Sequence, residues 1–408
     1  MSSNAPQPSA SGQPNSGLFT SGGGAAAPNP MSALASKPLV IEDLEAVLRQ
    51  SVAQGASDIH LHVGHPPMVR LYGAMQTLAM APVTERLLYE FVQKTIPARS
   101  LKLVDDQKEV DYGFGVPNLA RFRANLFYEL SRPALVLRIV AMEIPSLEAL
   151  ALPSIVRRFS NLNNGLVLVT GPTGSGKSTT LASLINVIVK ERAKHIITVE
   201  DPIEYLHTSA KSFVTQREIG VDTNDFSSGV KYALRQDPDV ILIGELRDRE
   251  TVAAALHAAE TGHLVFSTLH TSDAVQTIHR IINIFQPHER EPVRMQLSNI
   301  LRGTISQRLL PKKDNSGRVP IVEVMTATPT VMDYIQQNQI EQIYDLIRET
   351  EMGEMVSMNL SLYRAVQEGW IDPKEAMEQS NNPVQLGQML RGAYQGTASN
   401  LGQSGGLY

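Results

Sequence analysis

A glycine-rich turn, residues 171–178 (GPTGSGKS), stands between an apolar run at 166–170 (LVLVT) and a helical pattern at 179–190. The glycines permit backbone geometry that directs successive N–H groups at phosphate oxygens. A chance match to this G-x-x-x-x-G-K-[ST] pattern is expected in roughly one or two per hundred chains of this length. The strand–turn–helix context makes chance less plausible still. The turn therefore predicts a site for a nucleotide triphosphate.

The turn belongs to a longer alternation of strand and helix patterns, which predicts an α/β fold. Helical patterns, including residues 179–190 and 251–260, separate several short apolar runs rich in β-branched residues. The four runs are residues 166–170, 195–199, 240–243 and 264–267. Such runs are typical of buried parallel strands joined by crossover helices. Ligands of parallel sheets collect at the carboxyl ends of the strands, so the chemistry is expected just after each run.

Two residues of the turn have specific chemical roles in this interpretation. Lys177 supplies a positive charge to the β and γ phosphates, and the Ser178 hydroxyl is suited to bind Mg²⁺. The helix that begins there adds the positive end of its dipole. The predicted nucleotide-binding residues are Gly171, Pro172, Thr173, Gly174, Ser175, Gly176, Lys177, Ser178 and Thr179.

Carboxylates follow two of the apolar runs. Glu245 comes directly after the 240–243 run and Gly244, where an acid can hold Mg²⁺ together with Ser178. Glu200 and Glu204 follow the 195–199 run. One acid is expected to serve the metal and one to orient or deprotonate water. The alternative is that each acid caps a helix or pairs with a nearby arginine.

Two histidines flank the fourth run. His270 follows it, where a side chain could sense the γ phosphate, and His263 precedes it at the other end of the strand. Spacing alone favours neither a catalytic nor a structural role. No third ligand accompanies them, so a metal pair is not expected.

The region before the turn predicts a small α+β domain over residues 38–145. Residues 120–126 (ARFRANL) alternate, which places Arg121 and Arg123 on one face of a strand about 7 Å apart. Residues 135–140 (LVLRIV) are the expected partner strand. A low-complexity tail is predicted at 1–37, a linker at 146–163, the nucleotide-binding α/β domain at 164–350, helices at 351–391 and a second disordered tail at 392–408.

Composition excludes several classes of protein. The chain of 408 residues has 36 basic and 41 acidic side chains, a net charge of −5, which does not favour nucleic-acid binding. It contains no cysteine, which excludes disulfide scaffolds, cysteine-ligated zinc and thiol nucleophiles. No stretch approaches 18 consecutive apolar residues, so membrane insertion is not expected.

Five segments together resemble the secretion ATPase superfamily, and specifically the PilT/PilU retraction ATPases of type IV pili. They are GASDIHL, GPTGSGKSTTLA, ITVEDPIEY, RQDPDVILIGELRD and TGHLVFSTLHT. The match covers roughly residues 39–350. The resemblance implies a hexamer of two-domain subunits, each with a PAS-like α+β N-terminal domain and a RecA-like P-loop ATPase domain, here followed by a C-terminal helical bundle.

The same resemblance implies roles for particular residues, with ATP and Mg²⁺ as cofactors. Ser178 and Glu245 would hold the metal, Glu204 would activate water, and His263 and His270 would form the family's histidine pair. Family members place N-domain arginines against nucleotide, some in a neighbouring subunit, and the matching positions here are Arg121, Arg123 and Arg138. A solvated or interface-pairing charged face is the alternative for these arginines.

The resemblance implies a cytoplasmic motor, peripheral at the inner membrane, that drives pilus retraction through a PilC-like platform protein. A paralogous retraction ATPase is a further expected partner. Assembly relatives carry a four-cysteine zinc insertion that this chain lacks. However, the AIRNLIRE box of PilT-type members aligns with TVMDYIQQ at residues 330–337, where only the apolar positions persist. This favours as alternatives a PilU-like accessory ATPase with weak turnover or, less strongly, an assembly or secretion ATPase.

Overall fold

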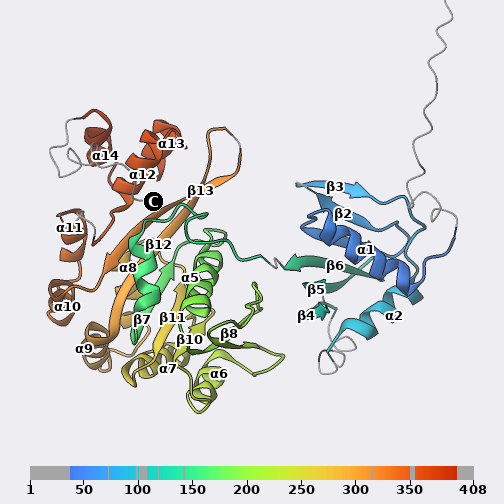
Figure 1. Ribbon diagram of the computed structural model, residues 1–408, viewed down its shortest axis with the longest axis horizontal. Coiled ribbons are helices and arrows are strands. Elements are labelled where there is room, and N and C mark those ends of the chain that lie inside the picture. Colours follow the sequence, from blue (N-terminus) through green and yellow to red (C-terminus); the bar gives the residue numbers. More distant parts are fainter. Residues whose placement is uncertain are drawn as a thin grey trace, which may run out of the picture.

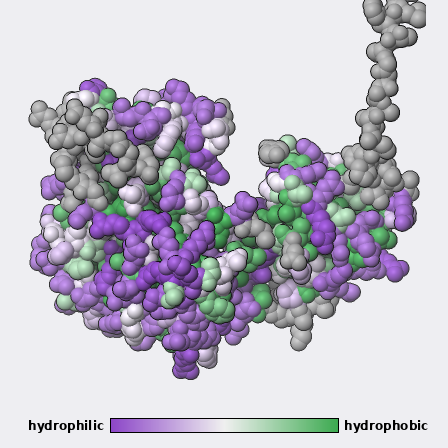
Figure 2. All heavy atoms as spheres, in the orientation of Figure 1, coloured by the Kyte–Doolittle hydropathy of each residue, from purple (hydrophilic) through white to green (hydrophobic). Residues whose placement is uncertain are grey.

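The computed structural model describes residues 37–71, 73–97, 100, 108–117, 119–140, 143–314, 316–349 and 354–392. They form a smaller N-terminal domain, a larger α/β domain and a group of C-terminal helices (Figure 1). The predicted tails at 1–37 and 392–408 lie almost wholly outside the described residues. The two domains lie on either side of a hollow that opens at the top of the view in Figure 2.

The N-terminal domain is an antiparallel sheet of six strands, in the order β3-β2-β1-β6-β5-β4, and helices α1 and α2 of the described residues pack on it. The strands are β1 Asp58–His62, β2 Met68–Leu71, β3 Ala74–Thr77, β4 Val110–Val116, β5 Ala120–Glu129 and β6 Arg132–Val140. The helices are α1 Ile41–Ala53 and α2 Glu85–Thr95. This arrangement is the α+β domain that the sequence predicted.

Strand β5 has the alternation expected of it. Phe122, Ala124 and their neighbours on the inner face are at most 3% exposed, because they pack against α1 and α2 in the core. Arg121 and Arg123 lie on the opposite face. Strand β6 is its antiparallel partner, and Arg138 on β6 is opposite Arg123. The three predicted arginines are therefore neighbours on one face of this sheet.

The larger domain is built on a seven-stranded sheet in the order β13-β12-β7-β11-β10-β8-β9. The strands are β7 Gly165–Thr170, β8 His195–Glu200, β9 Phe213–Glu218, β10 Val240–Ile243, β11 Leu264–Leu269, β12 Leu301–Pro311 and β13 Arg318–Thr326. All pairs are parallel except β12 with β13. The four predicted strands are its centre, β7, β11, β10 and β8.

Helices cover both faces of this sheet, which explains the continuous apolar runs. On β7, Leu166 and Leu168 face one helical layer, and Val167 and Val169 face the other. The first layer contains α6 Phe226–Ala233, α7 Arg249–Glu260, α8 Ala274–Asn283 and α9 Arg290–Ile300. The second contains α5 Lys177–Glu191, with the short helices α4 Ile155–Arg158 and η2 Phe159–Asn161 from the predicted linker packed against it.

Helices lie among the described residues of the 351–391 segment, as the sequence predicted. In the described part of the chain, the helices that follow the sheet are α10 Pro329–Gln336, α11 Gln342–Glu349, α12 Met358–Gln367, α13 Pro373–Gln379 and α14 Pro383–Leu390. Helices α10 and α11 pack on the main core, whereas α12 to α14 share a separate core with the outer ends of β12 and β13. None of the helices among the described residues has the length and apolar character needed to cross a bilayer.

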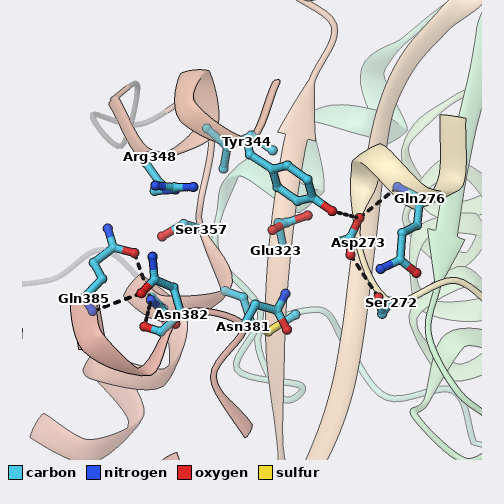
Figure 3. A pocket seen from close by; sticks show the side chains of 13 residues that line it. Ser272, Asp273, Gln276, Glu323, Tyr344, Arg348, Ser357, Asn381, Asn382 and Gln385 are labelled. Atoms are coloured by element: carbon cyan, nitrogen blue, oxygen red, sulfur yellow. Dashed lines mark hydrogen bonds between the residues drawn. The ribbon is translucent and has the colours of Figure 1, made fainter. Parts of the chain in front are cut away.

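A polar cavity of about 430 Å³ lies between α8, β13, α11 and the C-terminal helices (Figure 3). Glu323 of β13 lines it and accepts a hydrogen bond from the Ala274 N–H at 3.0 Å. The Tyr344 hydroxyl donates to Asp273 Oδ1 at 2.9 Å on the same wall. Burial, and to a smaller extent the charge of Asp273, raises the pKa of Glu323 to about 7.

Because the Glu323 carboxyl is buried, we expect the folded protein to lose stability as the pH rises from weakly acidic to weakly basic. Its folded pKa lies above the ordinary value, so its stabilising contribution is complete in acid and is lost as the pH rises through 7. The contribution is on the order of 3 kcal/mol, from about 1.4 kcal/mol per pKa unit. Glu323→Gln keeps an acceptor for Ala274 but does not titrate. Thermal unfolding is expected to show the variant gaining on the parent between about pH 5 and pH 8. Parallel pH profiles would contradict this assignment.

Candidate nucleotide site

The predicted phosphate loop lies between β7 and α5, at the carboxyl edge of the sheet. Helix α5 begins at Lys177, and Gly176 before it has a left-handed backbone with φ of 88°. A Cβ at Gly176 would lie 2.8 Å from Gln307 Nε2, on the neighbouring strand β12. Glycine is required there both by the backbone conformation and by this close approach.

The polar groups of the loop suit a phosphate. The Ser175 hydroxyl is buried and has no hydrogen-bond partner among the described residues. The backbone N–H groups of Thr173, Gly174 and Gly176 also donate to no backbone carbonyl of the described residues. The N-terminus of the 15-residue helix α5 adds its unpaired N–H groups. A loop with orphan donors at a helix start fits an anion such as a nucleotide phosphate.

Lys177 is 9% exposed and anchors the loop. Its Nζ donates to the carbonyl oxygens of Gly171, at 2.9 Å, and of Pro172, at 3.0 Å. Burial lowers the pKa of Lys177, against the opposing effect of two nearby carboxylates, Glu245 and Glu204. The fold therefore gathers the predicted lysine and both predicted acids at one edge of the sheet.

Glu245 follows β10 and is held by two cationic or polar side chains. Arg247 Nε donates to Glu245 Oε2 at 2.8 Å, and His270 Nε2 lies 3.1 Å from Glu245 Oε1. Arg247 Nη1 also lies 3.8 Å from Asp201 Oδ2, which joins the segment after β10 to the segment after β8. Among the described residues no three His, Asp or Glu side chains are placed to hold a metal ion. A Mg²⁺ ion here would need Ser178, Glu245 and phosphate oxygens together.

Glu204 lies in the segment after β8 and is exposed. Its carboxylate makes no hydrogen bond or ion pair to the described residues, but Lys177 is near enough to feel its charge. The adjacent Tyr205 hydroxyl is 2.9 Å from Thr179 Oγ1, which connects this segment to α5. A solvent-exposed carboxylate beside the phosphate loop is placed to act on water.

The structure separates the two predicted histidines. His270 contacts Glu245 at the carboxyl end of β11. His263 precedes β11, and its Nδ1 lies 2.9 Å from the Ala258 carbonyl oxygen at the opposite edge of the sheet. The strand between them, of six residues, spans about 20 Å. Within one chain, His263 does not join the site.

The three arginines differ in their contacts. Arg121 Nη2 is 2.5 Å from Glu218 Oε2 of the ATPase domain. Arg138 Nε donates to Asp58 Oδ1 at 2.9 Å within the N-terminal domain. Arg123 is exposed and makes no hydrogen bond or ion pair within the described part of the chain. Contact with nucleotide stays a prediction for all three.

Two residues that the sequence did not single out, Arg247 and Gln307, and the strand-end acid Glu200 complete the site. Arg247 belongs to GELRD, the end of one of the segments that resemble the family. This segment is the sequence signal that could have identified it. Glu200 is half-buried and accepts hydrogen bonds from Thr198 Oγ1, at 2.7 Å, and Gln216 Nε2, at 3.2 Å. Burial raises the pKa of Glu200. Gln307, whose Oε1 accepts from Thr180 Oγ1 at 2.8 Å, comes from a strand with no local motif.

A parallel sheet with a phosphate loop, two strand-end acids and a preceding α+β domain defines a P-loop ATPase. The chain belongs to the type II/IV secretion system protein family, whose model matches residues 33–378.

Three relatives narrow this class. The chain is 40% identical over 341 residues to the type IV pilus retraction ATPase PilT of Pseudomonas aeruginosa, covering 84% of this chain and 99% of that protein. It is 35% identical over 360 residues to the type IV pilus ATPase PilU of the same organism, covering 88% and 94%. A crystal structure of the pilus retraction motor PilT with bound ADP superposes with a TM-score of 0.78 at 43% identity, covering 86% of this chain and 100% of that one. These likenesses confirm the predicted PilT/PilU family, its two-domain fold and its ATPase class.

Removing the Lys177 charge is expected to abolish nucleotide turnover without unfolding the chain. In Lys177→Ala, kcat/KM for ATP should fall at least about 10²-fold, because the phosphates lose a preorganised positive charge. The rise in melting temperature on adding ATP should disappear as well. Lys190→Ala, which removes an exposed lysine from the same helix, is the matched control. Unchanged turnover in Lys177→Ala would contradict the site.

Proposed function

We propose that this chain is a hexameric, ATP-hydrolysing motor that powers type IV pilus retraction, and hence twitching motility, through an inner-membrane platform protein. The observation that carries the proposal is the alignment with PilT, which spans 99% of that protein at 40% identity. The likeness therefore includes both domains rather than the phosphate loop alone.

The roles proposed for the site residues follow their positions. The loop amides and Lys177 hold the phosphates, and Ser178 and Glu245 hold Mg²⁺, which when bound neutralises charge that develops on the phosphate oxygens. Arg247 and His270 fix the Glu245 carboxylate in its orientation. His270, in contact with Glu245 on one side, links the segment after β11 to the same centre.

Glu204 is proposed as the group that orients and deprotonates the attacking water. Its exposure leaves the carboxylate open to water, and its nearness to Lys177 places it beside the phosphates. A general base must lie within hydrogen-bond reach of the proton that it removes. Of the two predicted acids, Glu245 has two side-chain partners and Glu204 has none among the described residues, which supports this division of roles.

A hexameric ring is proposed because one of the arginines predicted to contact nucleotide has no partner among the described residues of its own chain. Arg123 projects from the N-terminal domain without a partner within the described residues, as an arginine that serves a neighbouring subunit would. The motor would act at the cytoplasmic side of the inner membrane, joined to it by the PilC-like platform protein. The net charge of −5 gives no support to a nucleic-acid partner.

A PilU-like accessory role is the second candidate, and helix α10 favours it. This helix carries the TVMDYIQQ segment in place of the retraction box, and PilU is matched over 94% of its length. Steady-state ATP turnover of the purified chain distinguishes the two. Turnover per subunit that rises with protein concentration, as rings assemble, supports the main motor. Weak turnover at every concentration supports the accessory role.

Cells test the function directly. Glu204 lies outside the phosphate loop, so it can be replaced without changing the loop. Cells that lack this protein are therefore complemented with the Glu204→Ala variant. Hyperpiliated cells that do not retract pili are expected, because the site still binds nucleotide but no longer activates water. Complementation with the unaltered chain is the control. Cells short of pili would instead indicate a pilus assembly ATPase.

A further inference from the structure

The N-terminal and ATPase domains meet at Glu218, the last residue of β9. Its side chain is 4% exposed, and its Oε2 accepts two hydrogen bonds from different parts of the chain. One donor is Arg121 Nη2 of the N-terminal domain, at 2.5 Å. The other is the N–H of Ile203, at 3.2 Å, which immediately precedes Glu204. One buried carboxylate therefore contacts both an arginine of the N-terminal domain and the segment that carries the predicted base.

The N-terminal domain is shaped to receive this carboxylate. Gly113 of β4 lies opposite Arg123 of β5, beside the point where Glu218 enters. A Cβ at Gly113 would lie 2.8 Å from Glu218 Oε1 and 3.0 Å from Arg121 Nη2. A side chain at position 113 would displace the end of the Glu218 or the Arg121 side chain from this contact. The ion pair thus occupies a fitted contact between the domains.

The Glu204 segment depends on two carboxylates for its position. Glu200 and Glu218 are side by side in the register of β8 and β9. Glu218 accepts from the Ile203 N–H at 3.2 Å, and the backbone N–H of Glu204 lies close enough to the Glu200 carboxyl to lower its pKa. The backbone that carries Glu204 is therefore hydrogen-bonded to Glu218 at Ile203 and lies against Glu200 at the next residue.

The two acids differ in what balances their charge. Glu200 has neutral partners, Thr198 and Gln216, and its burial favours the protonated form by raising its pKa. Glu218 has a full positive charge from Arg121. Withdrawing Arg121 would leave a buried carboxylate without its counter-charge, which is strongly unfavourable unless the carboxylate moves towards water. Such a movement would release the Ile203 N–H.

We propose that Glu218 is a positioning residue through which the N-terminal domain sets the place of Glu204. While the domains are apposed, Arg121 holds Glu218, and Glu218 holds the backbone of the catalytic segment. When the N-terminal domain rotates away, the segment loses this anchor and Glu204 leaves its working position. Domain rotation and water activation are thereby coupled through one ion pair. The inference rests on the proposed role of Glu204 in ATP hydrolysis.

This proposal assigns Arg121 a different job from an arginine that touches nucleotide. An arginine on the phosphates would act independently of Glu218, so Glu218→Gln would leave its effect intact. An arginine that acts through Glu218 would contribute nothing once Glu218 is neutral. A double-mutant cycle separates the two, because residues in one ion pair give non-additive effects.

The cycle comprises Arg121→Gln, Glu218→Gln and the double variant, each assayed as the full-length chain for kcat and KM with ATP. Each single variant is expected to lower kcat about tenfold, with KM within about twofold of the parent, because binding groups are untouched. The double variant is expected to lie within about twofold of the singles. Glu218→Leu, which also removes the acceptor for Ile203, is expected to lower kcat further.

Controls separate this inference from the proposed function. Glu129→Gln removes an ion pair, with His62, inside the N-terminal domain at the far end of β5, and should leave turnover unchanged. Full turnover in Glu204→Ala would overturn the proposed function and this inference with it. If Glu204→Ala is inactive but Glu218→Gln is fully active, or if the effects of Arg121→Gln and Glu218→Gln add, Glu218 is not a positioning residue.

Discussion

The ammonium group of Lys177 organises the ATPase site, because it is buried and must be compensated at every side. Two loop carbonyls accept its hydrogen bonds, and the carboxylates of Glu245 and Glu204 approach from the ends of two other strands. A parallel sheet makes this possible, since every strand delivers its following residue to the same edge. The loop glycines, the acids Glu245 and Glu204, and His270 all lie at this edge of the sheet, around the single buried charge of Lys177.

The acids around this centre are constrained to different degrees, and the difference matters for function. Glu245 is held by Arg247 and His270 from adjacent strand ends. The Glu204 carboxylate makes no hydrogen bond or ion pair among the described residues, and the backbone of its segment lies against two acids, the buried Glu218 and the half-buried Glu200. A metal ligand benefits from rigidity, whereas a base whose position is set through its backbone can be controlled from a distance. In our proposal the Arg121–Glu218 pair supplies such a control, because its two residues belong to different domains.

Local patterns were sufficient for the central part of this fold and insufficient for its margins. The loop, the four central strands and the face of β5 that bears the arginines have strong periodic or motif signals, and each was predicted within a few residues. Strand β9 alternates little and strands β12 and β13 carry no motif, so Gln307 and Glu218 could not be recognised. Their roles arise from contacts more than 90 residues apart in the chain. The separation of His263 from His270 followed from strand geometry, whereas the family pattern alone suggested a pair.

Arg121 and Arg123 are two residues apart on one strand, yet their surroundings assign them to different partners. Arg121 is 19% exposed and is satisfied by a carboxylate of its own chain, so another contact would require breaking that pair. Arg123 is exposed and makes no hydrogen bond or ion pair among the described residues, so a contact with nucleotide in a neighbouring subunit requires no such break. Strand β5 could therefore act on two nucleotide sites. Arg121 would act through Glu218 on the site of the same subunit, and Arg123 would act on the site of a neighbouring subunit. In a ring, this arrangement would couple the state of each subunit to the next without any additional element.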